Sequence, residues 1–294
     1  MRACPGAPGG RLDRTDWPRT EGEVWHATPG APGCPHCGEA SRGAGGSRFD
    51  WSFLDAAYCI SLRGRPDRAA AAAAEFHRVG LCERVTFFRP EKDADSVRLG
   101  IWQSHRTVAG HALRHGPTVL ICEDDLLFSD RIEPEAVRAV GAVMPTLPPD
   151  WMVLYLGHWP LWGYFVRRNL LRCGSACCHA YIASERMLRW LRDNPPDSVP
   201  IARIAGRGVD AAFARLPATY AMFPMLAIQR PSRSDNKGIG GGRRKKKLKH
   251  LITRSRRREL LLSSLMRPNE MLIAALSPGF FLWHRIAKAR AARR

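Results

Sequence analysis

Three consecutive acidic residues, Glu123, Asp124 and Asp125, follow an apolar segment at 117–122 that is predicted to be a strand. Carboxylates crowded at a strand end repel one another. A divalent cation such as Mn²⁺ or Mg²⁺ relieves that repulsion and leaves positions for substrate phosphates. Because side chains alternate along an extended chain, Glu123 and Asp125 share one side and are the predicted metal ligands. The alternative to metal binding is that these acids form a solvated turn at the end of the strand. The triplet alone does not define a reaction.

Predicted strands and helices alternate on both sides of this triplet. The strands are at 56–62, 84–89, 117–122, 151–156, 177–183 and 219–228, and the helices are at 66–79, 97–114, 184–191 and 209–216. This alternation predicts an α/β fold with a central mixed sheet flanked by helices. Ligands in such folds bind at the carboxyl ends of the strands, which is where the triplet lies.

Eight short segments, in chain order, carry a family resemblance. They are Tyr58–Leu62 with Arg65, Asp67 and Arg68, then Gly100–His105, Leu120–Asp125, Trp151–Gly157, His179–Ser184, Gly208–Asp210, Pro224–Gln229 and Ser234–Asp235. Together they resemble the motifs of glycosyltransferase family 25, the lipooligosaccharide β-galactosyltransferases and related collagen galactosyltransferases. The resemblance covers residues 57–235. It departs from the family pattern at Ser61, where Asn is usual, and at Ile101, where Cys is frequent, which bears on substrate preference more than on reaction type.

The resemblance implies a GT-A-like nucleotide-sugar-binding sandwich and a UDP-sugar donor used with Mn²⁺ or Mg²⁺. It also implies transfer with inversion to a glycan or glycolipid acceptor such as lipooligosaccharide. Galactose is the commonest sugar in the family. Inversion is a single displacement, which needs a base for the proton of the acceptor hydroxyl and an electrophilic group for the departing UDP.

The resemblance also assigns roles to individual residues. Asp210 is the predicted general base, and its alternative role is an N-cap of the helix that follows. His105 is predicted to contact donor or acceptor, with a structural histidine on an apolar helix as the alternative. The residues predicted to bind the donor are Ser61, Arg65, Arg68, Glu123 and Asp124. The two arginines suit bidentate contacts to phosphate, although ordinary surface charges would look the same in the sequence.

Composition divides the chain into three parts: a head at 1–48, a catalytic domain at 49–236 and a basic tail at 237–294. The head contains ten Gly and six Pro with little hydrophobic periodicity, so it is predicted to be disordered. Cys34 and Cys37 form one CxxC pair without a second, which favours free thiols over a zinc site. Nine cysteines and no apolar signal segment at the N-terminus predict reduced thiols in a cytoplasmic protein.

The tail carries 17 Lys or Arg against two acidic residues, which is +15 of the total net charge of +19. Leu, Phe and Trp lie between the basic residues at 243–294, a composition typical of interfacial helices on anionic membranes. We therefore expect a peripheral protein on the inner face of the cytoplasmic membrane. The same tail also supports the rival reading, a nucleic-acid-binding protein. No nucleic-acid-binding motif accompanies the tail, so no specific nucleic acid is expected.

Overall fold

The computed structural model describes residues 25–28, 49–129, 132–158, 160–175, 178–196 and 208–230. Nine strands of these residues form one mixed sheet in the order β1-β3-β2-β4-β9-β6-β10-β8-β7, and β5 and β11 form a second, two-stranded sheet. The strands are β1 (Trp25–Ala27), β2 (Ala56–Ile60), β3 (Val85–Phe88), β4 (Thr118–Glu123), β5 (Leu126–Phe128), β6 (Val153–Gly157), β7 (Pro160–Arg167), β8 (Leu170–Ser175), β9 (Ala180–Ser184), β10 (Thr219–Met222) and β11 (Ala227–Gln229).

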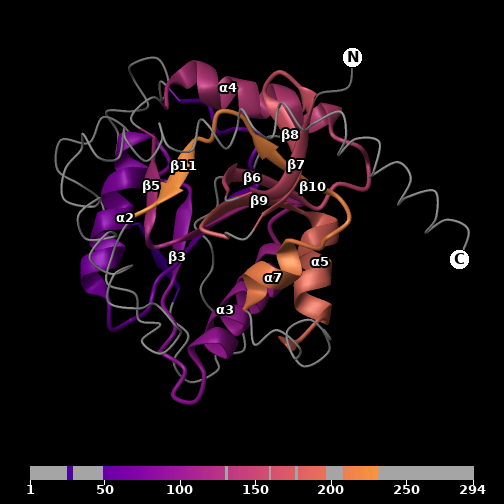
Figure 1. Cartoon of the computed structure of the whole chain (residues 1–294). Helices are drawn as coiled ribbons and strands as arrows, with labels where there is room; N and C mark the ends of the chain where they lie inside the picture. Colours follow the sequence, from indigo (N-terminus) through magenta and orange to yellow (C-terminus); the bar gives the residue numbers. More distant parts are fainter. Residues whose placement is uncertain are drawn as a thin grey trace, which may run out of the picture.

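Helices cover both faces of the large sheet, which makes a layered α/β sandwich (Figure 1). The helices are α2 (Pro66–Arg78), α3 (Val97–Ala112), α4 (Pro134–Val143), α5 (Glu185–Asp193) and α7 (Val209–Phe213). Helices α2 and α4 and the β5–β11 sheet pack on one face, and α3, α5 and α7 pack on the other. The predicted α/β class with a mixed sheet flanked by helices is thus confirmed.

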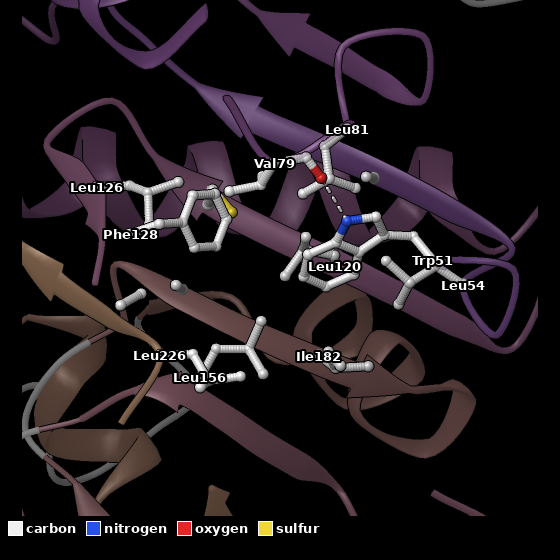
Figure 2. Packing of buried hydrophobic residues seen from close by; sticks show 14 of the residues in the cluster. Trp51, Leu54, Val79, Leu81, Leu120, Leu126, Phe128, Leu156, Ile182 and Leu226 are labelled. Carbon is white, nitrogen blue, oxygen red and sulfur yellow. Dashed lines mark hydrogen bonds between the residues drawn. The ribbon is translucent and has the colours of Figure 1, made fainter. Parts of the chain in front are cut away.

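Two buried faces explain why the central strands appear in the sequence as continuous apolar runs. Along β4, Leu120 and Cys122 join the core beneath α2 and α4, whereas Val119 and Ile121 join the core beneath α3 and α5. Figure 2 shows the first of these cores, in which the Trp51 indole donates a 2.8 Å hydrogen bond to the Val79 carbonyl at the end of α2. The strand that carries the acidic triplet is therefore fixed from both sides.

Local signals at the helix starts match the structure. Pro66 occupies the first turn of α2, where its missing N–H has no intrahelical partner to lose. The Ser96 side chain caps α3 by accepting from the Leu99 N–H at 3.3 Å, and Ser184 caps α5 by accepting from the Met187 N–H at 3.2 Å. These starts orient α2 and α3, which carry two of the predicted site residues, Arg68 and His105.

Strand directions bring several chain segments to one edge of the sheet. Strands β2, β3 and β4 are mutually parallel, and β6 is parallel to β10. Because β4 and β6 both pair antiparallel with β9, they point in the same direction. The carboxyl ends of β2, β3, β4, β6 and β10 and the start of β9 therefore share one edge, which we call the carboxyl edge.

The structure differs from the sequence-based prediction in several elements. The strand predicted at 219–228 is two strands in different sheets, because Pro224 has no N–H for a ladder and the chain turns at 223–226. The β7–β8 hairpin, β5 and α4 were not predicted. Trp25–Ala27 lies in the head that was predicted to be disordered, yet it forms β1 along β3, so that prediction does not hold for these three residues. No helix among the described residues is long and apolar enough to span a bilayer.

Two leucines provide a matched test of this packing. Leu120 in β4 is fully buried, whereas Leu99 on α3 is 42% exposed. Leu120→Ala should lower the free energy of unfolding by about 2–5 kcal/mol because it leaves a cavity beneath α2. Leu99→Ala should change it by no more than about 0.5 kcal/mol. Denaturant unfolding measures both, and similar losses in the two variants would contradict the described arrangement.

Candidate functional site

The acidic triplet lies at the carboxyl edge, held by backbone hydrogen bonds to two neighbouring segments. The Asp124 N–H donates to the Ile60 carbonyl at 3.0 Å, and the Glu123 N–H donates to the His179 carbonyl at 3.0 Å. Ile60 ends β2, and His179 immediately precedes β9. The triplet is therefore part of the sheet edge and not a loosely held turn.

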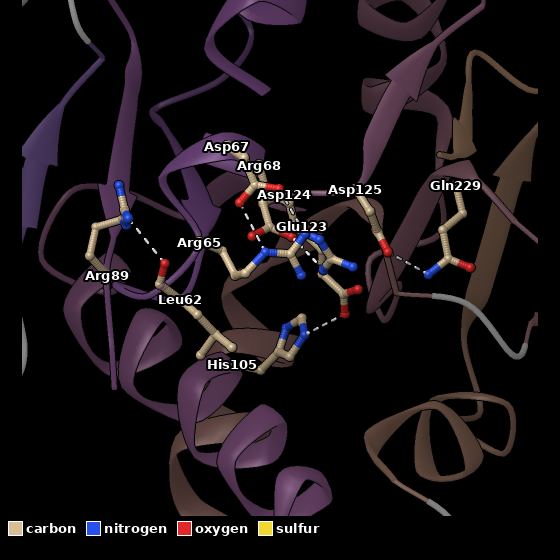
Figure 3. A network of polar contacts seen from close by, with 10 residues as sticks. All are labelled: Leu62, Arg65, Asp67, Arg68, Arg89, His105, Glu123, Asp124, Asp125 and Gln229. Carbon is tan, nitrogen blue, oxygen red and sulfur yellow. Dashed lines mark hydrogen bonds and ion pairs between the residues drawn. The ribbon is translucent and has the colours of Figure 1, made fainter. Parts of the chain in front are cut away.

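Each acid of the triplet contacts a different side chain, as Figure 3 shows. Glu123 Oε1 lies 3.3 Å from His105 Nε2, and Asp124 Oδ1 accepts a 3.1 Å ion pair from Arg68. Asp125 Oδ2 accepts from Gln229 Nε2 at 2.9 Å. Among these partners only Arg68 carries a positive charge, so the group formed by the triplet and its partners keeps excess negative charge.

Burial and mutual repulsion disfavour ionisation throughout the triplet. Loss of solvent raises the pKa of Glu123, and the neighbouring Asp124 charge raises it further. Burial raises the pKa of Asp125, with the Glu123 and Asp124 charges acting in the same direction. Burial also raises the pKa of Asp124, although Arg68 opposes this effect. A cation at this point would reverse all three shifts.

Asp210 belongs to the same electrostatic group. Asp210 is exposed as a residue, but partial desolvation of its carboxyl raises its pKa, and the negative charge of Glu123 raises it further, while Cys178 and His105 act to lower it. The structure thus brings together Asp210, Glu123 and His105, which lie far apart in the sequence. The alternative role for Asp210 is wrong, because the N-cap of α7 is Gly208 and Asp210 lies in the first turn of that helix.

His105 is enclosed by protein partners. It is buried, its Nδ1 lies 2.9 Å from the Tyr181 hydroxyl, and its Nε2 faces Glu123. Burial lowers the pKa of His105 to about 4, so the ring is neutral near pH 7. Both ring nitrogens have protein partners, which favours the structural alternative: His105 orients the Glu123 carboxylate instead of contacting a ligand.

The loop after β2 and the first turn of α2 carry the predicted donor-binding residues Ser61, Arg65 and Arg68. Arg68 reaches Asp124 directly, whereas Arg65 holds Asp67 through two hydrogen bonds of 2.9 and 2.8 Å. The Ser61 N–H donates to the Phe88 carbonyl at 2.9 Å. The Ser61 hydroxyl is buried near Asp124, whose pKa it lowers, but it has no partner in hydrogen-bond geometry among the described residues. Ser61 Oγ is therefore a buried polar atom beside the carboxylates that lacks a well-formed hydrogen bond.

Two residues of this region were not predicted as site residues. Gln229 holds Asp125 across 104 residues of sequence, and its only signal was its place in a motif of the resemblance. Arg89, directly after β3, donates to the Leu62 and Arg63 carbonyls, at 3.0 Å each, and so fixes the loop that carries Arg65 and leads into α2. Its only signal was a basic residue at the end of the strand predicted at 84–89.

Several sequence-based predictions fall outside the described residues. They concern Ser234 and Asp235, Cys34 and Cys37, and the basic tail at 237–294.

No protein-family model matches the chain, and no curated protein matches it. Function is therefore inferred from the side chains at the carboxyl edge.

A divalent cation fits this edge by the chemistry of the donor set. Within the described parts of the chain, no three His, Cys, Asp or Glu side chains are arranged as a ready set of metal ligands. Mn²⁺ and Mg²⁺, however, commonly use one or two carboxylates and take their remaining ligands from water and substrate phosphates. Asp125 Oδ1 is buried and has no hydrogen-bond partner among the described residues, so it remains available as such a ligand.

Repulsion within the triplet gives a stability test. Asp125→Asn removes one like charge and keeps an oxygen for Gln229. In buffer with EDTA at pH 8 it should raise the free energy of unfolding by about 1 kcal/mol, the equivalent of roughly one pKa unit. Asp55→Asn is the matched control, because exposed Asp55 accepts from the Thr118 N–H at 2.8 Å at the opposite edge of the sheet. Denaturant unfolding that showed no gain for Asp125→Asn would contradict the repulsion.

Proposed function

We propose that this protein is an inverting glycosyltransferase that transfers a sugar, most commonly galactose in the family it resembles, from a UDP-sugar to a glycan or glycolipid acceptor. The observation that carries the proposal is the acidic triplet Glu123, Asp124 and Asp125 at the carboxyl edge of a mixed α/β sheet, with Asp210 electrostatically coupled to Glu123. Its excess negative charge suits a cation that binds a diphosphate. The GT-A-like description of the sandwich is part of the same proposal.

Glu123 and Asp125 are the residues that would hold Mn²⁺ or Mg²⁺. The bound ion would neutralise the charge that develops on the departing UDP. His105 and Gln229 orient the two carboxylates through hydrogen bonds of 3.3 and 2.9 Å. Both partners are uncharged, so they position the carboxylates without neutralising them.

Arg65, in the loop after β2, and Arg68, in the first turn of α2, lie near the same edge (Figure 3). A guanidinium group binds phosphate oxygens through paired N–H donors, so each arginine could contact the donor diphosphate. Arg68 also contacts Asp124 and so links the start of α2 to the acidic triplet. The Ser61 hydroxyl, which is buried beside Asp124, supplies a further donor or acceptor for the nucleotide.

Asp210 is the proposed general base. In a single displacement it would take the proton of the acceptor hydroxyl as that oxygen attacks the anomeric carbon and UDP leaves. Its raised pKa strengthens it as a base while leaving it ionised at neutral to alkaline pH. Its electrostatic coupling to Glu123 supports this role, because it indicates that Asp210, on α7, lies near a proposed metal ligand.

Two other readings are weaker. A nucleic-acid-binding protein would depend on the basic tail at 237–294, which lies outside the described residues, and it leaves the carboxylate cluster without a role. A glycosyltransferase-like protein without activity would not need to keep the whole acidic triplet. Attachment of residues 243–294 to an anionic membrane, on the inner face of the cytoplasmic membrane, remains a prediction from the basic and apolar residues of the sequence.

Donor binding tests the proposal directly. Calorimetry with UDP and Mn²⁺ should show binding by the wild-type chain that EDTA abolishes. Asp125→Asn should weaken it by about tenfold or more, because the ion loses a charged ligand. Asp55→Asn should bind normally. A screen of UDP-galactose, UDP-glucose and the two N-acetylhexosamine donors, reading released UDP, then identifies the sugar. Absence of Mn²⁺-dependent UDP binding by the wild-type chain would refute the proposal.

Asp210→Asn separates proton removal from binding. The amide keeps the size of the carboxylate but cannot accept the proton, so kcat should fall by about 10²–10⁴-fold while donor affinity stays within about threefold. Steady-state kinetics together with UDP calorimetry make the comparison. Near-normal turnover in this variant would assign the base to another residue, with Asp235 as the next candidate.

A further inference from the structure

Two histidines at the carboxyl edge have no role in the mechanism above. His158 follows β6 and is 2% exposed, and His179 precedes β9 and is 3% exposed. All four of their ring nitrogens are buried without a hydrogen-bond partner in the part of the chain that the structure describes. Buried polar groups are nearly always paired in proteins, so two adjacent exceptions require an explanation.

The sheet places both histidines beside the proposed metal-binding carboxylates. Strand β9 lies between β4 and β6, with Ala180 paired to Cys122 on one side and to Gly157 on the other. The His179 carbonyl accepts from the Glu123 N–H at 3.0 Å, and His158 directly follows Gly157. Glu123, His179 and His158 therefore follow one another across three neighbouring strands at the same edge.

Because residue 157 is glycine, the His179 ring has room to lie against the backbone at this position. A Cβ atom at this residue would lie 2.1 Å from His179 Nε2 and 2.5 Å from the Ala227 carbonyl oxygen, both too close for any other side chain. The Ala227 carbonyl lies close enough to raise the pKa of His179 as a hydrogen-bond acceptor does, although its geometry with the ring is not that of a well-formed hydrogen bond. The His179 ring is therefore held by close packing against the backbone, and its nitrogens make no well-formed hydrogen bond among the described residues.

Burial keeps both rings neutral. It lowers the pKa of His158 to about 3, with His179 acting in the same direction, and lowers the pKa of His179 to about 4. A neutral imidazole has one N–H donor and one nitrogen acceptor. The pair therefore offers two donors and two acceptors with no charge, a combination that matches hydroxyl groups, each of which donates and accepts. A phosphate or carboxylate would instead require donors only, preferably charged.

We propose that His158 and His179 form a sugar-binding subsite, in which the two imidazoles exchange hydrogen bonds with hydroxyls of a hexose. This inference rests on the proposed glycosyltransferase function and extends it: the acidic triplet and the arginines bind the UDP part, and the histidine pair recognises the sugar. The hexose can be the one carried by the donor or the one that ends the acceptor. The chemistry is the same in both cases, and the experiment distinguishes them.

Replacement of each histidine by leucine tests the subsite. Calorimetry with Mn²⁺ measures the affinity for UDP and for the UDP-sugar identified by the donor screen, and kinetics measure KM for the acceptor. His158→Leu and His179→Leu should leave UDP affinity within about threefold and lower the preference for UDP-sugar over UDP by about tenfold, the effect of one or two lost hydrogen bonds. A rise of KM for the acceptor instead would assign the hydroxyls to the acceptor sugar.

Stability measurements separate recognition from a structural role. Leucine removes unpaired buried polar atoms, so denaturant unfolding should show unchanged or increased stability in both variants. His158→Gln keeps a donor and an acceptor and should recover part of the sugar preference. His115→Leu is the matched control, because His115 follows α3 at the opposite edge of the sheet, and it should change neither the preference nor KM.

The two proposals fail in different ways. Normal UDP binding by both leucine variants, with an unchanged sugar preference and an unchanged KM for the acceptor, would overturn the subsite and leave the proposed function intact. A loss of UDP binding equal to the loss of UDP-sugar binding would also overturn it, because the histidines would then act on the nucleotide or on the fold. Absence of UDP binding by the wild-type chain would overturn the proposed function and the subsite together.

Discussion

Repulsion among carboxylates at the carboxyl edge is the constraint on which the site depends. The triplet cannot relax away, because Asp124 and Glu123 are tied by their N–H groups to the segments on either side of β4. The neighbouring residues oppose the repulsion through hydrogen bonds from His105 and Gln229 and through the positive charges of Arg68, which contacts Asp124, and of Arg65. A chain selected for stability alone would place an apolar or basic residue at one of these positions. The arrangement is better explained by a cation that arrives with the substrate.

The identity of the partners supports this explanation. A structural cluster of buried acids is normally matched by an equal number of Arg or Lys side chains, which makes each pair neutral. Here two of the three acids of the triplet are held by neutral groups that fix direction and leave the charge in place. His105 is suited to this task because its own position is fixed by Tyr181 and burial keeps it neutral. Preorganised carboxylates of this kind bind a cation without reorganisation at the moment of binding.

Local sequence signals predicted the elements that they control and no others. The Pro66 start of α2, the helical spacing of α3 and the apolar run of β4 each depend on a few neighbouring residues, and each is found in the structure. The run predicted as one strand at 219–228 forms β10 and β11, which belong to different sheets. Pairing with distant strands determines this division, and a continuous apolar run in the sequence does not reveal it. The same limit applies to the site. The triplet was visible in the sequence, but Gln229 as its partner and the unpaired state of His158 and His179 arise from contacts between distant segments.

Unpaired buried polar atoms are not spread evenly over the described residues. They include Ser61 Oγ after β2, Asp125 Oδ1 after β4, and the ring nitrogens of His158 after β6 and of His179 before β9. These four residues lie at the carboxyl edge, and two further atoms of this kind, Trp25 Nε1 and the Tyr155 hydroxyl, belong to β1 and to the middle of β6. Each such atom destabilises the fold by about 1–3 kcal/mol, and an apolar replacement would remove that cost. Their concentration at one edge, next to carboxylates that repel each other, is the pattern expected where the missing partners belong to a polar, phosphate-bearing ligand.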